Sequence, residues 1–349
     1  MAINYTGTTR NYSELEEITT EIYSASKTFR DAVIDINDGH KSGTDVYESK
    51  VSVSMTALNT GGVSSTGDID LNVNKTPVSL YTYNYEDTID DNVLKGTRFE
   101  KSMKAGAFET ISDEFDRKVL IEVTPAIGED LENKIWNGAT TATKVAIAAL
   151  IPGASQGSIS AGAQTLVAAM PTTLFDSITA KVIYNNSQAK AVPGAGLGDY
   201  IKVPSIATVT SVTIAAEYAK AYAIAPEKVI NATQADQMPK IFAPLGDRQL
   251  IKIANNTVGA AQQVNFLVEG AGENEKIYYN GIEIIFVPLV GFRIITAPKH
   301  LKVLMDAMSD MNALMVDRMA NGAMQRYIKN VGSIATWVTN QRYITLYGG

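Results

Sequence analysis

Apolar and polar residues alternate along part of this chain and recur at helical spacing elsewhere. Alternation with a period of two predicts strands at residues 51–57 and 69–73, on either side of the polar, Gly-containing stretch 59–68. This arrangement is typical of a long antiparallel hairpin, and the aromatic tract at 80–85 continues in an extended pattern. A two-stranded hairpin is marginally stable alone in water, so we expect it to lie on another surface.

Helical spacing appears in two long stretches. Residues 13–36 begin with a Ser/Glu capping pair and continue with apolar residues three or four positions apart, which predicts an amphipathic helix. Residues 98–137 carry a second apolar stripe among charged residues. Pro125 lacks a backbone donor, so we expect it to kink or restart that helix, and Gly138 favours its end.

The second half of the chain mixes short helices and strands. Residues 139–215 are rich in Ala, Gly, Ser and Thr and predict a short helix at 175–183 among loops, and residues 217–229 predict a partly helical segment. The predicted strands are residues 240–243 (followed by a helix from Leu245), 282–287 after an Asn-Gly turn, a second apolar run after Pro288, 313–318, 325–329 and 343–347.

Composition limits the classes of function. The chain has 349 residues, 45% of them hydrophobic and 19% charged, which is enough for about two or three domain-sized units. A chain with so few charges must cover its surface with Ser, Thr, Asn, Gly and Ala, or place part of that surface against partners. The net charge is -7 and no stretch is rich in Lys and Arg, which argues against a dedicated nucleic-acid module but is compatible with a container that has a neutral inner wall.

The chain contains no cysteine, which excludes disulfides and thiolate chemistry. Its first residues lack a signal-peptide pattern, and no apolar stretch approaches the roughly 20 residues of a membrane span. We therefore expect a soluble protein that is made inside a cell.

Candidates for catalysis or metal binding are few. The two histidines, His40 and His300, lie outside HExxH, HxH and GxSxG patterns, and we interpret both as solvated turn residues. Asp306 and Asp310 could share a helix face, but neither an activating base nor a metal partner accompanies them. We assign no catalytic, cofactor-binding or metal site, and we expect no enzyme.

Two Gly-rich stretches and two acidic clusters have ordinary interpretations. Residues 193–200 (PGAGLGDY) and 152–165 lack the complete dinucleotide and phosphate-loop patterns, so we expect plain loops. The carboxylates at 113–116 and 129–132 lie on the helical pattern with Lys and Arg nearby. This predicts a solvated helix face with intrahelical ion pairs.

The order of these elements resembles the major capsid proteins of tailed bacteriophages, which have the Hong Kong 97-type fold. In that family a strand–Pro–strand passage is followed by a pattern similar to NLfvGtDl and then a further Asp. Here the passage is followed by residues 300–307 (HLKVLMDA), Asp310 and the apolar run 314–316. His300 and Leu304 stand where the family's Asn and Gly are usual, so the motif is loose.

The resemblance implies an α+β fold of the Hong Kong 97 type, in which each part of the chain has a structural role. The parts it implies are an N-terminal arm (1–45), an extended hairpin loop (46–95), a long spine helix of the peripheral domain (96–138), an α/β axial domain (139–295) and strands that return to the peripheral domain (296–349).

The same resemblance implies a self-assembling virion protein. Hexamers and pentamers would form an icosahedral shell around packaged double-stranded DNA, which the inner wall would contact non-specifically after assembly in the host bacterial cytoplasm. Residues 1–45 leave little room for a built-in scaffolding segment, so we expect a separate scaffolding protein and a portal as partners, but neither a membrane nor a cofactor. Lys50 and Lys75 flank the hairpin, yet the covalent Lys–Asn cross-link of the family's namesake is assigned to neither.

Three other functions stay open. An encapsulin-like nanocompartment shell around a cargo enzyme is favoured by the helix predicted at 13–36 and opposed by the long hairpin. A tail-tube or fibre protein is opposed by the helical region 98–137. An enzyme lacks a recognisable site.

Overall fold

The structure is a computed structural model of the chain. It describes residues 26–53, 69–90, 113–150, 159–187, 206–232, 237–257, 266–270, 275–306, 314–318, 325–339 and 343–348. Most of the helix predicted at 13–36, the hairpin tip at 59–68 and the Gly-rich stretch 193–200 lie outside these residues.

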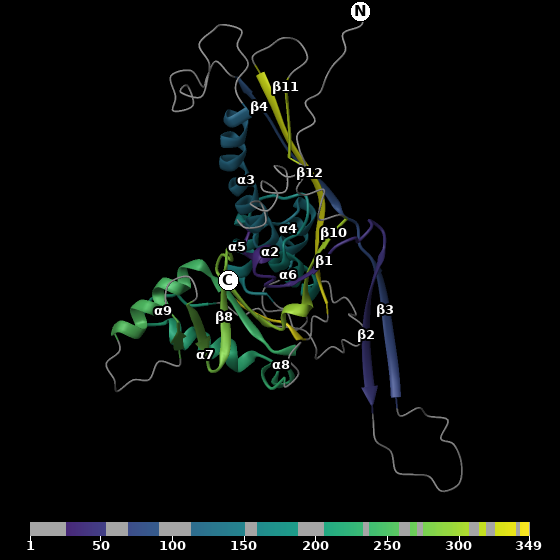
Figure 1. Cartoon of the computed structure of the whole chain (residues 1–349). Coiled ribbons are helices and arrows are strands. Elements are labelled where there is room, and N and C mark those ends of the chain that lie inside the picture. Colours follow the sequence, from purple (N-terminus) through teal and green to yellow (C-terminus); the bar gives the residue numbers. More distant parts are fainter. Residues whose placement is uncertain are drawn as a thin grey trace, which may run out of the picture.

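Helices and sheets are mixed, as expected, and two long features extend from the main body (Figure 1). One is a ribbon made of β2 (Asp45–Val53) and β3 (Ile69–Pro77). The other combines α3 (Asp113–Trp136) with β4 (Tyr81–Asp90) and β12 (Gln325–Val338), which run side by side away from the body in the opposite direction.

A six-stranded sheet forms the centre of the body, with strand order β13-β9-β5-β8-β7-β6. Strands β5 and β8 pair in parallel, and the other neighbours pair antiparallel. Its strands are β5 (Lys240–Pro244), β6 (Phe266–Glu269), β7 (Lys276–Tyr279), β8 (Ile282–Val287), β9 (Phe292–Thr296) and β13 (Thr345–Gly348).

Both faces of this sheet are buried along β5, β8, β9 and β13. Phe242 and Ile294 point into one apolar core, and their chain neighbours Ile241 and Ile295 point into a second core on the opposite face. Successive strand residues face opposite sides, so burial of both faces requires nearly continuous apolar strands. The runs in β8 and β9 have this character.

Helices cover both faces. The first core contains side chains of α3, α4, α5 and α6, and the second contains side chains of α7 and α9. The Trp136 and Phe242 rings, with centroids 5.3 Å apart, join α3 to the sheet. The helices not yet bounded are α2 (Lys27–Arg30), α4 (Thr141–Ala148), α5 (Ala161–Ala169), α6 (Ile178–Ser187), α7 (Ile214–Ile224), α8 (Glu227–Ile230), α9 (Leu245–Thr257) and the short 3-10 turn η4 (Pro298–His300).

A second sheet closes the first core from the other side. β12 pairs with β4 along one edge and with β10 (Leu301–Met305) and β11 (Leu314–Arg318) along the other, and β1 (Asp35–Asn37) adds a parallel strand to β10. Leu301, Val303 and Met305 alternate inward from β10 into the core shared with the six-stranded sheet.

The β2–β3 ribbon forms a two-stranded sheet of its own. Its base is fixed where the Gly43 amide donates to the Val78 carbonyl at 2.8 Å and Val78 packs against Leu304. Beyond the base the ribbon projects from the body (Figure 1). The strands predicted at 51–57 and 69–73 are confirmed at residues 51–53 and 69–73, and residues 54–57 lie outside the described residues.

The segment around α2 is held to α3 by a buried carboxylate. Glu132 accepts hydrogen bonds from the Ser26 hydroxyl, from the Thr28 amide at 3.0 Å and from the Thr28 hydroxyl at 2.7 Å. The Trp136 indole donates to the same Thr28 hydroxyl at 2.8 Å, and the Lys27 ammonium donates to the Phe286 carbonyl at 3.1 Å. This segment thus bridges α3 and the six-stranded sheet.

The helix predicted at 13–36 is wrong over its last part. α2 is a single turn that ends before Ala32, whose φ is +44°, and residues 35–37 form β1. Pairing with β10, including an Asp35–Lys302 ion pair at 2.7 Å, replaces the helical pattern. By contrast, α3 runs through Pro125 without a restart and ends at Trp136, as Gly138 predicted.

The last strand also lies where the domain assignment did not place it. Residues 343–347 were expected among the strands that return to the peripheral sheet, but β13 pairs with β9 in the six-stranded sheet. Leu346 and Tyr347 point into opposite cores, and only a sheet that is buried on both faces accommodates apolar side chains in both directions.

Local signals predicted the turn and the strand–helix step correctly. Asn280 and Gly281 both have positive φ, +47° and +81°, as a tight turn between β7 and β8 requires. β5 leads directly into α9 at Leu245, as its sequence indicated.

Replacing Gly291 by alanine should lower the free energy of unfolding by about 1–3 kcal/mol, because its φ is +71° and a Cβ there would meet Leu166. Gly246→Ala in α9 is the matched control. A Cβ at Gly246 would meet no atom within 4 Å, so this change should be neutral or stabilising by less than about 1 kcal/mol. Urea unfolding measures both, and equal effects would contradict the explanation.

Candidate functional site

The described residues offer no evident centre for metal chemistry. Within them, no group of three or more His, Cys, Asp or Glu side chains is arranged to hold a metal ion. No helix in the same part of the chain has the length and apolar character that a membrane span requires.

The two histidines are buried, so the interpretation of solvated turn residues is wrong. His300 stacks on Tyr343 with ring centroids 5.2 Å apart, and its Nδ1 lies 3.4 Å from the Thr339 hydroxyl. His40 donates its backbone amide to the Met305 carbonyl at 2.8 Å. Both histidines therefore pack around β10. His300 lies at the start of β10, beside the end of β12, and His40 lies at the end of β10.

The acidic residues separate into different roles. Asp130 forms the expected intrahelical ion pair with Lys134 at 2.5 Å, whereas Glu132 is buried against the α2 segment instead of lying on a solvated face. Asp306 follows strand β10, so the predicted helix face is absent there, and Asp310 lies outside the described residues.

Lys50 and Lys75 lie on the two strands of the ribbon. The Lys75 ammonium forms an ion pair with Asp45 at 2.7 Å, near the base. The hydrogen bond from Lys75 and the charge of Asp45 raise the pKa of Lys75. Strand β2 carries Lys50 opposite Asn72.

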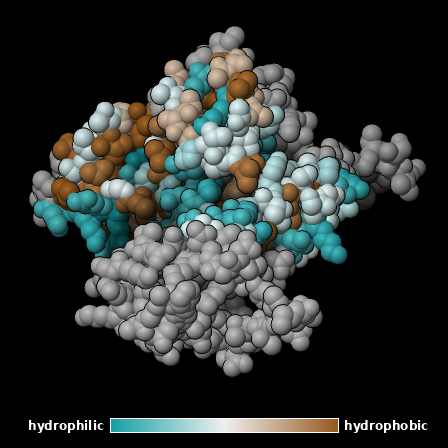
Figure 2. Space-filling model, turned by 90° about the horizontal axis from the view of Figure 1, so that it is seen from above, coloured by the Kyte–Doolittle hydropathy of each residue, from teal (hydrophilic) through white to brown (hydrophobic). Residues whose placement is uncertain are grey.

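Large apolar side chains are exposed on several elements. Figure 2 shows hydrophobic side chains gathered toward the side of the molecule that carries α7 and α9 in Figure 1. Strand β6 ends the order of the six-stranded sheet, and its Leu267 and Val268 are exposed. The other exposed large apolar residues are Tyr47, Tyr81, Val145, Leu174, Val212, Ile224, Met238, Leu245, Ile253 and Val290. Exposed apolar patches and open strand edges are typical of surfaces that meet partners.

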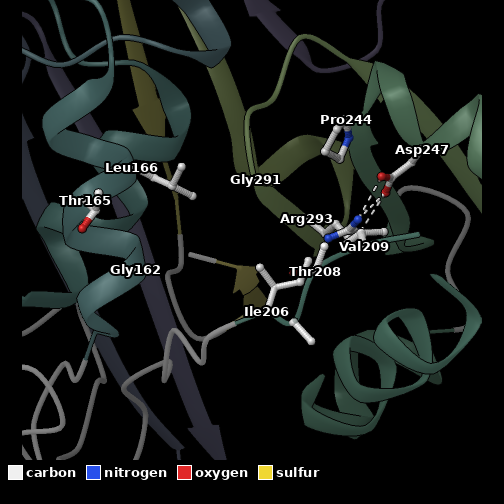
Figure 3. A pocket seen from close by; sticks show the side chains of 11 residues that line it. Gly162, Thr165, Leu166, Ile206, Thr208, Val209, Pro244, Asp247, Gly291 and Arg293 are labelled. Carbon is white, nitrogen blue, oxygen red and sulfur yellow. Dashed lines mark hydrogen bonds and ion pairs between the residues drawn. The ribbon is translucent and has the colours of Figure 1, made fainter. Parts of the chain in front are cut away.

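A pocket of about 540 Å³ opens where α5 approaches the end of β5 and the start of β9 (Figure 3). Figure 3 shows Leu166 pointing from α5 toward the segment that carries Ile206 and Thr208. The lining residues are Gly162, Thr165, Leu166, Ile206, Ala207, Thr208, Val209, Pro244, Asp247, Gly291 and Arg293. We call this site the Arg293 pocket.

A buried ion pair forms one wall of the Arg293 pocket. Arg293 lies in β9 and Asp247 in the first turn of α9; the Arg293 Nε donates to one carboxylate oxygen at 2.8 Å and Nη2 to the other at 2.9 Å. Both side chains are nearly inaccessible to solvent. A two-point pair of this kind fixes the orientation of both groups and connects α9 to the sheet.

Tyr218 of α7 completes the network. Its hydroxyl donates to Asp247 at 2.9 Å, and the Arg293 guanidinium carbon lies 5.2 Å from its ring centroid. Burial raises the pKa of Tyr218, and burial also raises the pKa of Asp247 against the opposing effect of Arg293. The Nη1 atom of Arg293 has no hydrogen-bond partner among the residues that the structure describes.

A second polar contact joins α7 to β13. Buried Glu217 accepts hydrogen bonds from the Tyr347 hydroxyl and from the Lys220 ammonium, the latter at 2.7 Å. Burial alone would raise the pKa of Glu217, but the hydrogen bonds from Lys220 and Tyr347 outweigh it and the pKa is lowered. Burial and the bond to Glu217 raise the pKa of Tyr347.

Sequence reasoning missed Arg293, Asp247, Tyr218 and Glu217. One signal was present: Arg293 interrupts the apolar run of β9, and a charged residue within a buried strand requires a partner. Its partner lies 46 residues away along the chain, and nothing in the local sequence identifies it.

Comparison with solved structures found similar proteins, whereas comparison of the sequence found none. Neither the scan against protein-family models nor the search of curated proteins found a match. Among solved structures, the capsid of Myoviridae phage XM1 aligns with a TM-score of 0.51 at 10% identity, over 92% of this chain and 91% of that one. The chain therefore has a capsid fold of the Hong Kong 97 type.

Two further solved structures align over most of both chains. The procapsid of satellite phage P4 has a TM-score of 0.49 at 11% identity and covers 95% of this chain and 98% of that one. The holo-SrpI encapsulin complex of Synechococcus elongatus has a TM-score of 0.44 at 7% identity and covers 99% and 92%. The capsid fold shown by the phage XM1 match agrees with the resemblance found in the order of elements.

Removing Arg293 should destabilise the capsid fold strongly. Arg293→Met leaves the Asp247 carboxylate buried without its partner, which should cost about 3–5 kcal/mol of unfolding free energy. Arg293→Met combined with Asp247→Asn removes both charges and keeps an acceptor for Tyr218, so it should recover most of that loss. Urea unfolding of the unassembled subunit measures each variant, and a double variant no better than the single one would refute this explanation.

Glu217 should make stability depend on acid pH. The pKa of Glu217 in the folded chain is below its ordinary value of 4.5. Its contribution to the free energy of unfolding is therefore complete above about pH 4.5, and this contribution is lost as the pH falls through the lowered pKa of the folded chain. The difference in unfolding free energy between the natural chain and Glu217→Gln should therefore be constant near neutral pH and shrink below about pH 4.5. Urea titrations between pH 3 and 7 test this, and a pH-independent difference would exclude the assignment.

Proposed function

We propose that this chain is the major capsid protein of a tailed bacteriophage. Copies assemble into hexamers and pentamers, and these form an icosahedral shell around packaged double-stranded DNA. The observation that carries the proposal is the capsid fold shared with the phage XM1 capsid over nearly the whole length of both chains. The protein is accordingly a structural component of the virion and not an enzyme.

The projecting ribbon supports assembly. β2 and β3 pair only with each other within the described residues, and Tyr47 on the ribbon is 65% exposed. An isolated two-stranded ribbon is marginal in water. We infer that its partner surface is a neighbouring copy, which would bury Tyr47 and supply the missing support.

The surface chemistry agrees with extensive contacts between copies. Charged residues make up 19% of the chain, below the usual quarter, and apolar side chains are exposed on α9 and β6. Permanent interfaces are larger and more apolar than ordinary protein surface. In an assembled shell, neighbouring copies would cover this apolar surface, so it would not cause aggregation.

The parts of the chain take the roles expected from the family. Residues 1–45 are proposed as the N-terminal arm, 46–95 as the extended loop, 96–138 as the spine-helix region, 139–295 as the axial domain and 296–349 as the return to the peripheral domain. Because β13 pairs with β9 in the six-stranded sheet, we propose that residues 345–348 belong with the axial domain.

The proposal includes further partners. A separate scaffolding protein and a portal would direct assembly in the host bacterial cytoplasm, and the inner wall would contact DNA without reading its sequence. The net charge of -7 is compatible with such weak contact, since tight phosphate binding needs clustered Lys and Arg. Neither a membrane nor a cofactor takes part.

An encapsulin-like shell is the second candidate, because this fold serves either purpose. The argument from an N-terminal helix is weaker than the sequence indicated, because residues 31–37 leave the helical conformation. A tail-tube or fibre protein is disfavoured by the 24-residue α3.

The purified chain, expressed alone or with its scaffold, should form closed shells or sheets of hexamers in negative-stain electron microscopy. The absorbance ratio at 260 and 280 nm then reports packaged nucleic acid. Shells of one small size that co-purify an enzyme would favour the encapsulin-like alternative. A monodisperse monomer under all of these conditions would refute the assembly hypothesis.

Tyr47→Ser tests the ribbon in the same assay. Because Tyr47 is exposed in the single chain, the substitution should change subunit stability by less than about 0.5 kcal/mol. The yield of shells should nevertheless fall about tenfold, equivalent to about 1.4 kcal/mol of contact energy. An unchanged yield with unchanged stability would show that the ribbon does not need this contact.

A further inference from the structure

Residues 26–44 run from a contact with α3, past β10, to the base of the β2–β3 ribbon (Figure 1). We call this segment the strap. We infer that the strap is a conformational device that couples its two ends: when its attachment to Glu132 of α3 opens, the base of the ribbon loosens. The coupling belongs to the single chain and is testable without assembly. Its use in a shell rests on the proposed function.

The first attachment of the strap is a buried carboxylate. Glu132 accepts hydrogen bonds from the Ser26 hydroxyl and from the amide and hydroxyl of Thr28, and all three residues are buried. Within the described residues, the hydrogen-bond donors of Glu132 all belong to the strap, and all are neutral. A buried charge that loses such donors is unfavourable. The attachment therefore holds the strap firmly as long as the three bonds are intact.

Beyond this attachment the strap follows one edge of β10. Its strand β1 pairs in parallel with residues 302–304. The His40 amide then donates to the Met305 carbonyl at 2.8 Å. Strand β12 pairs with the other edge of β10. The strap thus completes the hydrogen bonding of β10 on the side that β12 does not cover.

Strand β10 also supports the base of the ribbon. The buried Leu304 side chain packs against Val78 and Ala335, on the face of β10 that is opposite the first core. Val78 in turn has two backbone bonds to the end of the strap: it accepts from the Gly43 amide at 2.8 Å and donates to the Thr44 carbonyl at 3.2 Å. The base is therefore held by the strap itself and by the strand that the strap supports.

Release of the strap should act on the base through both of these supports. The strand order places β1 at the end of the second sheet, so β10 becomes the end strand when β1 leaves. Segments with fewer contacts open more readily, and a chain of contiguous contacts with two discrete arrangements is able to couple distant sites. Coupling is also reciprocal. A loosened ribbon base should therefore weaken the attachment at Glu132.

Amide hydrogen exchange of the unassembled subunit tests the coupling. Glu132→Ala should accelerate exchange at the Val33 amide, which bonds within the strap, and at the Gly43 and Val78 amides in the base, each by at least about tenfold. Glu217→Ala is the matched control, because Glu217 is also a buried carboxylate that accepts from a hydroxyl but joins α7 to β13. It should change exchange at the base by less than about threefold.

A conservative variant separates the specific contact from general packing. Glu132→Gln keeps an acceptor oxygen for the Thr28 amide, so exchange at the base should stay within about threefold of the natural chain. Fast exchange in the strap of Glu132→Ala with unchanged exchange at Gly43 and Val78 would show that the two ends are independent. Equal acceleration of the base by Glu217→Ala would mean that both variants only lower global stability, and this too would overturn the inference.

The reverse experiment does not depend on the folding of Glu132→Ala. Val78→Ala removes buried contacts with Leu304 at the base, and reciprocity predicts about tenfold faster exchange at the Val33 amide. Val229→Ala is the matched control, because Val229 is similarly buried but lies in the second core; it should leave the Val33 amide within about threefold. No acceleration at Val33 by Val78→Ala would refute the coupling even if the chain assembles into shells. Acceleration would uphold the coupling even if it does not.

Discussion

The requirement to bury both faces of the six-stranded sheet organises the rest of this fold. Its strands are apolar in both directions, so helices must cover the two sides: α3 to α6 on one and α7 with α9 on the other. The first of these layers is itself closed by the second sheet. Segments that find no place in these layers, above all the β2–β3 ribbon, project from the body.

Two buried carboxylates connect parts of the chain that apolar packing alone would not orient. Glu132 accepts hydrogen bonds from Ser26 and Thr28 and fixes the early segment on α3. Asp247 binds Arg293 and Tyr218, and so joins α9, β9 and α7. Hydrogen bonds are directional and apolar contacts are not, which explains why single polar residues set the relative positions of whole elements.

Two further features are compatible with the proposed role in a shell. Within the described residues, the β2–β3 ribbon pairs with no other strand and β6 ends the six-stranded sheet with Leu267 and Val268 exposed. Few charges oppose close contact between copies. Under the proposed function, contacts between copies would cover these two surfaces.

The sequence alone determined the elements whose signals are local. Period-two alternation predicted the ribbon, Asn280 and Gly281 predicted the turn before β8, and the order of elements already resembled the capsid family. Only the tertiary structure decided that residues 31–37 leave the helix and 35–37 pair with β10, that β13 joins the six-stranded sheet, and that Asp247 is the partner of Arg293. The reason is physical: turns and strand periodicity depend on neighbours in sequence, whereas strand partners and buried ion pairs depend on residues that only folding brings together.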